Sequence, residues 1–129
     1  MVTAKRSGES YCVEVSNGHS VLLSDTQKNG KGGTAGMRPH ELLESALAAC
    51  VCMSMDMAAE RAGVTLPEGS VDVTIERLDQ ETGFEVSLRF AAALTEAQQE
   101  LVRNAVQSSP VARTLGKPVK VRPGVILAS

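Results

Sequence analysis

The sequence has very few aromatic residues: no tryptophan, one tyrosine and two phenylalanines among 129 residues. Binding of single-stranded nucleic acid by base stacking needs aromatic side chains, so this class of function is excluded. The formal net charge is −2, which predicts no basic surface for nucleic acid or for an anionic membrane. Any core must therefore be built mainly from valine, leucine, alanine and methionine.

Cysteine is also scarce. Three cysteines are an odd number and do not describe a disulfide framework, so we expect a cytoplasmic protein with reduced thiols. Residues 1–11 are polar and lack the apolar core of a signal peptide. Asp56 and Glu60 interrupt the longest apolar stretch, so no membrane span is expected. Histidine, cysteine and carboxylate groups with metal-ligand spacing are missing, and we expect neither a metal nor a cofactor.

The segment from Met37 to Val64 is the longest helix-favouring stretch. Pro39 suits the first position of a helix and Gly63 suits the residue after its end. Apolar residues follow helical spacing along one stripe, which predicts a helix that is buried on most sides. The residues of this stripe are Leu43, Leu47, Cys50, Met53 and Met57.

Before this helix, alternating residues predict a strand over 11–15, with Cys12 on its polar face. A return strand is predicted over 20–23, joined to the first by the turn signal Asn17-Gly18. The glycine-rich residues 25–36 predict a flexible connection. After the helix, residues 71–76 and 84–90 alternate and predict a second hairpin.

The remainder of the chain favours helices. Thr95 begins a capping box, and Ser109 and Pro110 suit the N-cap and first residue of a short helix that ends at Leu115. A last strand is predicted over residues 119–121. This order of elements indicates one α+β domain spanning residues 1–129.

Cys50 is the candidate for thiol chemistry. The helix dipole is weak about a dozen residues from the helix start, and burial alone raises a thiol pKa. A reactive Cys50 would need a cation from elsewhere, with Arg6, Arg38 and Arg113 as candidates. Alternatively, Cys50 is a small core residue. Cys52 points about 200° around the helix from Cys50, so a disulfide between them is excluded.

The residues from Gly36 to Leu43, followed by Ala46 to Cys50, resemble the signature of the OsmC/Ohr family (osmotically inducible protein C and organic hydroperoxide resistance protein). The segment from Ser109 to Leu115 is similar to the second motif of that family. The resemblance implies antiparallel sheets wrapped around a long central helix, in an intertwined homodimer. It also implies that the Cys50 thiolate attacks an organic hydroperoxide and that an external dithiol restores the thiol.

This chain departs from the family pattern at three places. Ser109 stands where the second motif has a cysteine, and serine cannot condense with a sulfenic acid, although it suits the N-cap. His40 stands where the motif has a glutamate, with Glu41 next to it, so either residue is a candidate to face Cys50. The family arginine comes from the N-terminal region, where Arg6 and Arg38 are the candidates and neither stands in a closely matching motif.

Two functional hypotheses follow. In the first, the protein is a thiol-dependent hydroperoxide reductase with Cys50 as its peroxidatic thiol, resolved by an outside thiol or by Cys12 or Cys52. Arg38, His40, Glu41 and Ser109 complete its candidate site. In the second, the protein is a peroxidase-inactive dimer that binds a small apolar ligand at its interface.

Overall fold

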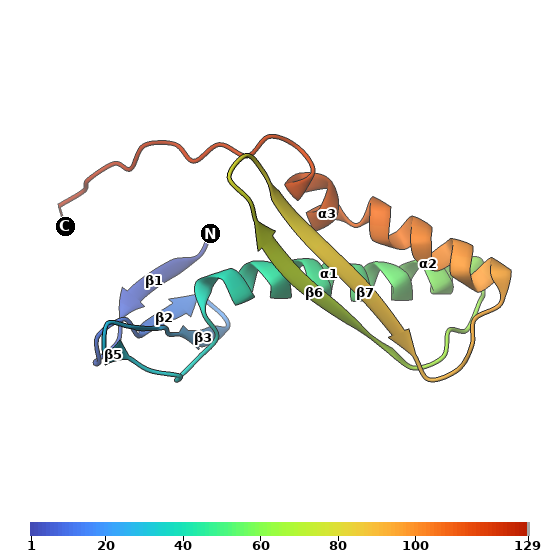
Figure 1. Cartoon of the computed structure of the whole chain (residues 1–129), viewed down its shortest axis with the longest axis horizontal. Coiled ribbons are helices and arrows are strands. Elements are labelled where there is room, and N and C mark those ends of the chain that lie inside the picture. The colour runs from blue at the N-terminus through green and yellow to red at the C-terminus, as the bar shows by residue number, and fades with distance from the viewer. Residues whose placement is uncertain (129) are drawn as a thin grey trace. The chain divides into compact units, whose positions relative to one another are not determined.

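The computed structural model describes residues 1–128 and has antiparallel sheets and one long helix (Figure 1). The α+β fold class is therefore confirmed. The chain divides into two compact units, the first formed by Met1–Ala46 and Val73–Glu85, the second by Leu47–Asp72 and the chain from Val86 onward. Helix α1 (Pro39–Ala62) and the hairpin of β6 (Gly69–Arg77) and β7 (Thr82–Phe90) contribute to both units. The single domain over 1–129 stays a prediction.

The first unit contains a three-stranded antiparallel sheet in the order β1-β2-β3. Its strands are β1 (Thr3–Arg6), β2 (Val13–Ser16) and β3 (Val21–Ser24). The predicted turn between the last two is confirmed, because Asn17 Oδ1 accepts the backbone N–H groups of His19 and Ser20 at 2.9 and 2.7 Å. Strand β1 lies outside the sequence prediction, since its residues carry no apolar alternation.

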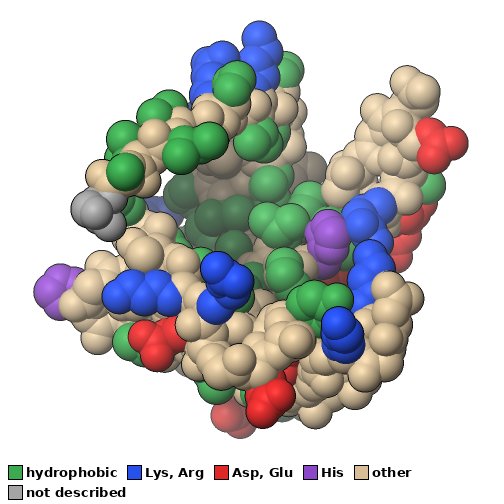
Figure 2. Space-filling view, turned by 90° about the vertical axis from the view of Figure 1, so that its left-hand side faces the viewer, with side chains coloured by type: hydrophobic (Ala, Val, Ile, Leu, Met, Phe, Trp, Pro, Cys, Tyr) green, Lys and Arg blue, Asp and Glu red, His purple; other side chains and the backbone are tan. Residues whose placement is uncertain are grey.

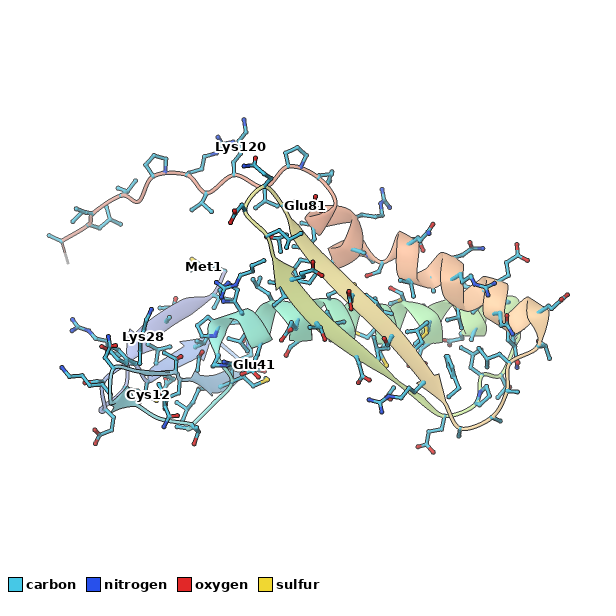
Figure 3. All side chains as sticks on the ribbon, viewed as in Figure 1. Met1, Cys12, Lys28, Glu41, Glu81 and Lys120 are labelled. Carbon is cyan, nitrogen blue, oxygen red and sulfur yellow. The ribbon has the colours of Figure 1, made fainter. Side chains whose placement is uncertain are left out.

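Cys12 does not lie on the polar face of a strand, as the alternation predicts. Strand β2 begins one residue later, because Tyr11 has a φ of 71° and interrupts the extended backbone. Cys12 is 7% exposed and belongs to the small core of the first unit. Figure 3 labels it beside the small strands of this unit.

The segment from Asp25 to Gly36 differs from the flexible connection that its glycines predict. It contains a hairpin of β4 (Gln27–Lys28) and β5 (Lys31–Gly32), which turns at Asn29 and Gly30 with φ values of 54° and 76°. The buried Asp25 carboxylate accepts the N–H groups of Thr26, Gly33 and Ala35. One carboxylate thus supplies the hydrogen bonds that hold the segment.

Helix α1 has the predicted ends. Gly63 has a φ of 66° and donates its N–H to Glu60 O at 3.2 Å, while Val64 N–H reaches Ala59 O at 2.9 Å. These two bonds form a Schellman motif, which satisfies carbonyls at the helix end and favours glycine at this position.

The predicted apolar stripe of α1 is right at Leu47 and wrong at Leu43, Met53 and Met57. The buried side chains are Leu47, Val51, Met55 and Ala59, which follow one another at four-residue spacing. Leu43, Met53 and Met57 are 44%, 59% and 50% exposed. Met53 and Met57 lie on another face of the helix, whereas Leu43 stands one turn before Leu47 in the same row. Figure 2 shows apolar side chains at the molecular surface. The helix is therefore much less buried than its composition predicts.

By length and composition alone, α1 could also cross a membrane. The interruption by Asp56 and Glu60 therefore does not remove the helix from that class, as the sequence analysis expects. Core helices of soluble proteins pass the same test, so this finding is weak support for a membrane span.

The later elements match the sequence closely. The β6–β7 hairpin is confirmed, followed by α2 (Glu96–Ser108) and α3 (Pro110–Leu115). The capping box is confirmed: Thr95 Oγ1 accepts Gln98 N–H at 3.1 Å, and Gln98 Oε1 accepts Thr95 N–H at 2.8 Å. The last predicted strand is wrong, because residues 119–121 pair with no strand among residues 1–128 and are exposed.

Candidate active site around Cys50

Cys50 lies midway along α1, in the second unit, and is half-buried. The backbone N–H of Val111, the second residue of α3, donates a hydrogen bond to Cys50 Sγ, with an N···S distance of 3.5 Å. This N–H belongs to the first turn of α3, where backbone donors have no acceptor within the helix. The fold thus gives the thiol a backbone donor from a segment 61 residues away.

Ser109 lies directly before α3 and is fully buried. Its hydroxyl makes no side-chain capping bond to α3, and Ser109 Oγ has no well-formed hydrogen bond within residues 1–128. The predicted N-cap is therefore right in position but wrong in mechanism. The hydroxyl lies instead beside the Cys50 thiol.

The surroundings of Cys50 lower its pKa below the ordinary value of a thiol. The largest cause is the Ser109 hydroxyl, followed by the Val111 N–H, and both outweigh the opposing effect of burial. The Ser54 hydroxyl, four residues further along α1, also lowers the pKa. Hydrogen bonds to a thiolate stabilise the charged form, which is the form that attacks electrophiles.

This result differs from the expected role of arginine. None of the groups that lower the pKa of Cys50 within the described chain is Arg6, Arg38 or Arg113. Within the described chain, hydroxyl and amide donors lower this pKa, and a role for one of these arginines stays a prediction. The sequence is enough to predict that Ser54 lies near Cys50, because residues four apart share a helix face. It does not predict that Val111 lies near Cys50, because this contact depends on the tertiary fold.

Arg38 and Glu41 form the second pair of candidate residues, in the first unit. Glu41 Oε1 accepts the backbone N–H of Arg38 at 2.9 Å, and Arg38 Nε lies 3.3 Å from the same oxygen. The Arg38 N–H is the largest cause that lowers the pKa of Glu41, followed by the guanidinium. Figure 3 labels Glu41 at the start of α1. The pair fixes the N-terminus of α1, while His40 is exposed.

The three cysteines are free thiols, Cys12 buried and Cys50 and Cys52 half-buried. Cys50 and Ser109 come together as the resemblance implies, and Arg38 and Glu41 form a separate pair. The described part of the chain holds no group of three or more histidine, cysteine or acidic residues suited to a metal ion.

A groove of about 720 Å³ lies in the second unit, between residues of α1 and α2. It begins near the thiol, because Ser54 and Pro110 are among its lining residues. Met57, Ala58 and Leu101 give it an apolar wall. A small organic molecule fits a groove of this size and polarity.

Comparison with known proteins identifies a family whose sequences resemble this chain. The sequence profile described as OsmC-like protein matches residues 30–123. No curated protein matches the chain.

Several solved structures share the fold. An OsmC-like protein of Mycoplasma pneumoniae has a TM-score of 0.70 and 17% identity, covering 90% of this chain and 86% of its own. An organic hydroperoxide resistance protein OsmC of Legionella pneumophila has a TM-score of 0.65 and 18% identity, covering 88% and 86%. The organic hydroperoxide resistance protein OhrB of Bacillus subtilis has a TM-score of 0.58 and 20% identity, covering 88% and 87%.

These structural similarities agree with the motifs around Pro39 and Cys50 and with the match over most of the chain. The resemblance inferred from the sequence is therefore confirmed: the chain belongs to the OsmC-like protein family.

Proposed function

We propose that the protein reduces organic hydroperoxides with the Cys50 thiolate, in defence against oxidative stress. The observation that carries this proposal is the hydrogen bond from the Val111 N–H to Cys50 Sγ at 3.5 Å, made beside the buried Ser109 hydroxyl. The hydroxyl, followed by this N–H, lowers the pKa of Cys50. A thiolate, not a thiol, is the nucleophile in such a reaction. The proposal is further supported by the names of the Legionella and Bacillus structures, which are hydroperoxide resistance proteins.

In the proposed reaction, Cys50 Sγ attacks the terminal oxygen of ROOH. A sulfur–oxygen bond forms, the O–O bond breaks, and the leaving alkoxide takes a proton to become the alcohol ROH. Cysteine is oxidised to a sulfenic acid while the hydroperoxide is reduced. Val111 N–H and the Ser54 hydroxyl hold the thiolate before the attack.

Three further residues of the family motif contribute to the proposed site. Arg38 and Glu41 act as the pair that orients the reactants, and His40 is the alternative to Glu41. Their motif positions support these roles, together with the observed pairing of Arg38 with Glu41.

An external dithiol restores the thiol in two steps, because Ser109 cannot supply a resolving sulfur. The first sulfur of the dithiol attacks the Cys50 sulfenic acid, and water leaves as a mixed disulfide forms. The second sulfur then releases the Cys50 thiol and leaves the reductant oxidised. We place this chemistry in a cytoplasmic homodimer, where a second copy covers the exposed apolar face of α1.

The test measures the loss of cumene hydroperoxide with dithiothreitol present. We expect wild type and Cys52→Ser to consume the peroxide and Cys50→Ser to lose the activity. Cys52→Ser is the matched control, because this thiol is also half-buried on the same helix. Equal rates for wild type and Cys50→Ser would refute the proposal.

A second candidate is a peroxidase-inactive dimer that binds a small apolar ligand. Two observations favour it: Ser109 in place of the second cysteine, and the groove of about 720 Å³ that begins near Ser54. This alternative requires a Cys50 pKa near or above the reference of about 8.5. The Ser109 hydroxyl and the Val111 N–H lower the pKa of Cys50, which is the direction that the reductase requires.

A further inference from the structure

The Ser109 hydroxyl is an unusual group in this structure. Ser109 is 0% exposed, and Oγ has no hydrogen-bond partner within the described residues. An unpaired polar atom in a protein interior costs free energy, so such a group calls for an explanation. The ordinary explanation for serine before a helix is capping, and Ser109 makes no capping bond.

The position of the Ser109 hydroxyl suggests which group accepts its hydrogen bond. It lies beside Cys50 Sγ, which Val111 N–H approaches to 3.5 Å from the same helix start. The N–H is already used by the sulfur, whereas the O–H makes no well-formed hydrogen bond while Cys50 is a thiol. Oxidation of Cys50 places a new oxygen on this sulfur, and a sulfenate oxygen is a strong hydrogen-bond acceptor.

We propose that the Ser109 hydroxyl donates a hydrogen bond to the sulfenate oxygen of oxidised Cys50, so that Cys50 is a site where this modification persists. This inference rests on the proposed reaction of Cys50 with organic hydroperoxides. It gives Ser109 a positive role: the hydroxyl holds the oxidised product that a cysteine here would consume. The protein then stays oxidised until an outside thiol reaches Cys50.

The Cys50 sulfenate forms by a single oxidation of the thiol. The hydroperoxide supplies the oxygen and leaves as the alcohol, and the sulfenic acid loses one proton to solvent to become the sulfenate. A second hydroperoxide would carry it to the sulfinic acid, which thiols do not reduce. A hydrogen bond from Ser109 withdraws electron density from the sulfenate, so it slows this second oxidation.

The experiment adds two equivalents of cumene hydroperoxide to the reduced protein without a reductant, one to form the sulfenic acid and one to supply the oxygen of any sulfinic acid. Dimedone added at intervals traps the sulfenic acid, and peptide mass spectrometry locates the label at Cys50 and measures sulfinic acid there. The variants are Ser109→Ala and the control Ser108→Ala, whose exposed hydroxyl bonds only Asn104 O within its helix. Ser109→Ala keeps the α3 backbone intact, because no capping bond is lost.

We expect Cys50 of wild type and of Ser108→Ala to stay reactive toward dimedone for the same time. Ser109→Ala should lose this reactivity about tenfold faster, a factor that corresponds to one hydrogen bond to a charged group. Sulfinic acid should accumulate in its place. If all three proteins form the sulfenic acid and lose it at one rate, the inference fails while the proposed function stands. If wild type forms no sulfenic acid and consumes no peroxide, the proposed function itself fails.

Discussion

The backbone N–H of Val111 meets the sulfur of Cys50 across 61 residues, at 3.5 Å. The contact joins the middle of α1 to the first turn of α3, and it brings Ser109 to the same sulfur. A cysteine in the middle of a helix gains little from the dipole of its own helix. The site instead obtains its donors from the start of another helix.

The first prediction concerns the pH at which Cys50 reacts. The pKa of Cys50 is lowered by Ser109, Val111 and Ser54, so its thiolate should form at a lower pH than that of an ordinary thiol, whose pKa is about 8.5. Alkylation of Cys50 by iodoacetamide, measured by peptide mass spectrometry against pH, gives this pKa. Ser109→Ala should move the midpoint upward, because the largest stabiliser of the thiolate is removed.

Ser54→Ala should shift the same midpoint upward by less, and Ser108→Ala should leave it unchanged. A midpoint in Ser109→Ala equal to that of wild type would show that the hydroxyl does not stabilise the thiolate.

The second prediction restores a thiol at position 109. Because the Ser109 side chain lies beside Cys50 Sγ, Ser109→Cys should form a disulfide with Cys50 after one equivalent of organic hydroperoxide. Intact-mass measurement should show a loss of about 2 Da, reversed by dithiothreitol. Ser108→Cys is the control, since its side chain is exposed and bonds Asn104. If both thiols of Ser109→Cys stay free under these conditions, the side chain at position 109 does not lie beside Cys50 Sγ.

Local sequence signals predict much of the fold. The capping box at Thr95, the Schellman end at Gly63 and the turn at Asn17 depend on residues within a few positions of one another, and each forms as expected. The family motifs likewise predict that Cys50 and Ser109 meet. The capping box, the Schellman end and the turn need no knowledge of distant contacts.

The predictions that are wrong concern residues whose surroundings come from distant parts of the chain. Cys12 is buried by the first unit although its pattern places it on a polar face, and Asp25 orders a glycine-rich segment through hydrogen bonds to residues up to ten positions away. The donors to Cys50 include Val111, whose backbone N–H carries no sequence signal at all. Periodicity alone also selects the wrong face of α1, because the buried face depends on what covers it.

The third prediction compares a side-chain hydroxyl that caps a helix, that of Thr95, with one that does not, that of Ser109. Thr95→Ala should lower the free energy of unfolding by about 1 kcal/mol, because it removes the acceptor for Gln98 N–H in the capping box. Ser109→Ala should cost much less, because the serine hydroxyl makes no capping bond to α3. Urea unfolding of the reduced proteins at pH 7 measures both. A larger loss in Ser109→Ala than in Thr95→Ala would mean that the hydroxyl stabilises α3 after all.

The fourth prediction concerns the exposed methionines of α1. Met53 and Met57 are 59% and 50% exposed and lie four residues apart on the helix surface. If a second copy covers them, the double change Met53→Glu and Met57→Glu should produce a monomer, because charges in an apolar interface are costly. Sedimentation equilibrium measures this against the chain mass of 13.6 kDa. Leu78→Glu, at an exposed apolar residue of the hairpin turn, should leave the dimer intact.

The last prediction uses the acid sensitivity of the buried carboxylate in the first unit. The backbone N–H groups, with Ala35 as the largest influence, hold the pKa of Asp25 below its ordinary value of 3.8. A carboxyl whose pKa is lower in the folded chain stabilises the fold above its unfolded pKa, and this stabilisation is lost as the pH falls through the folded pKa. Asp25→Asn should therefore unfold more easily than wild type at pH 7.

The difference between the two proteins should shrink between about pH 5 and about pH 2, because wild type loses the contribution of the charged carboxylate there and the amide has none to lose. Urea unfolding across this range, followed by far-ultraviolet circular dichroism, gives the two curves. Asp79→Asn, at an exposed turn residue, should track wild type at every pH. Parallel curves for Asp25→Asn and wild type would show that the hydrogen bonds to Thr26, Gly33 and Ala35 do not depend on the charge of Asp25.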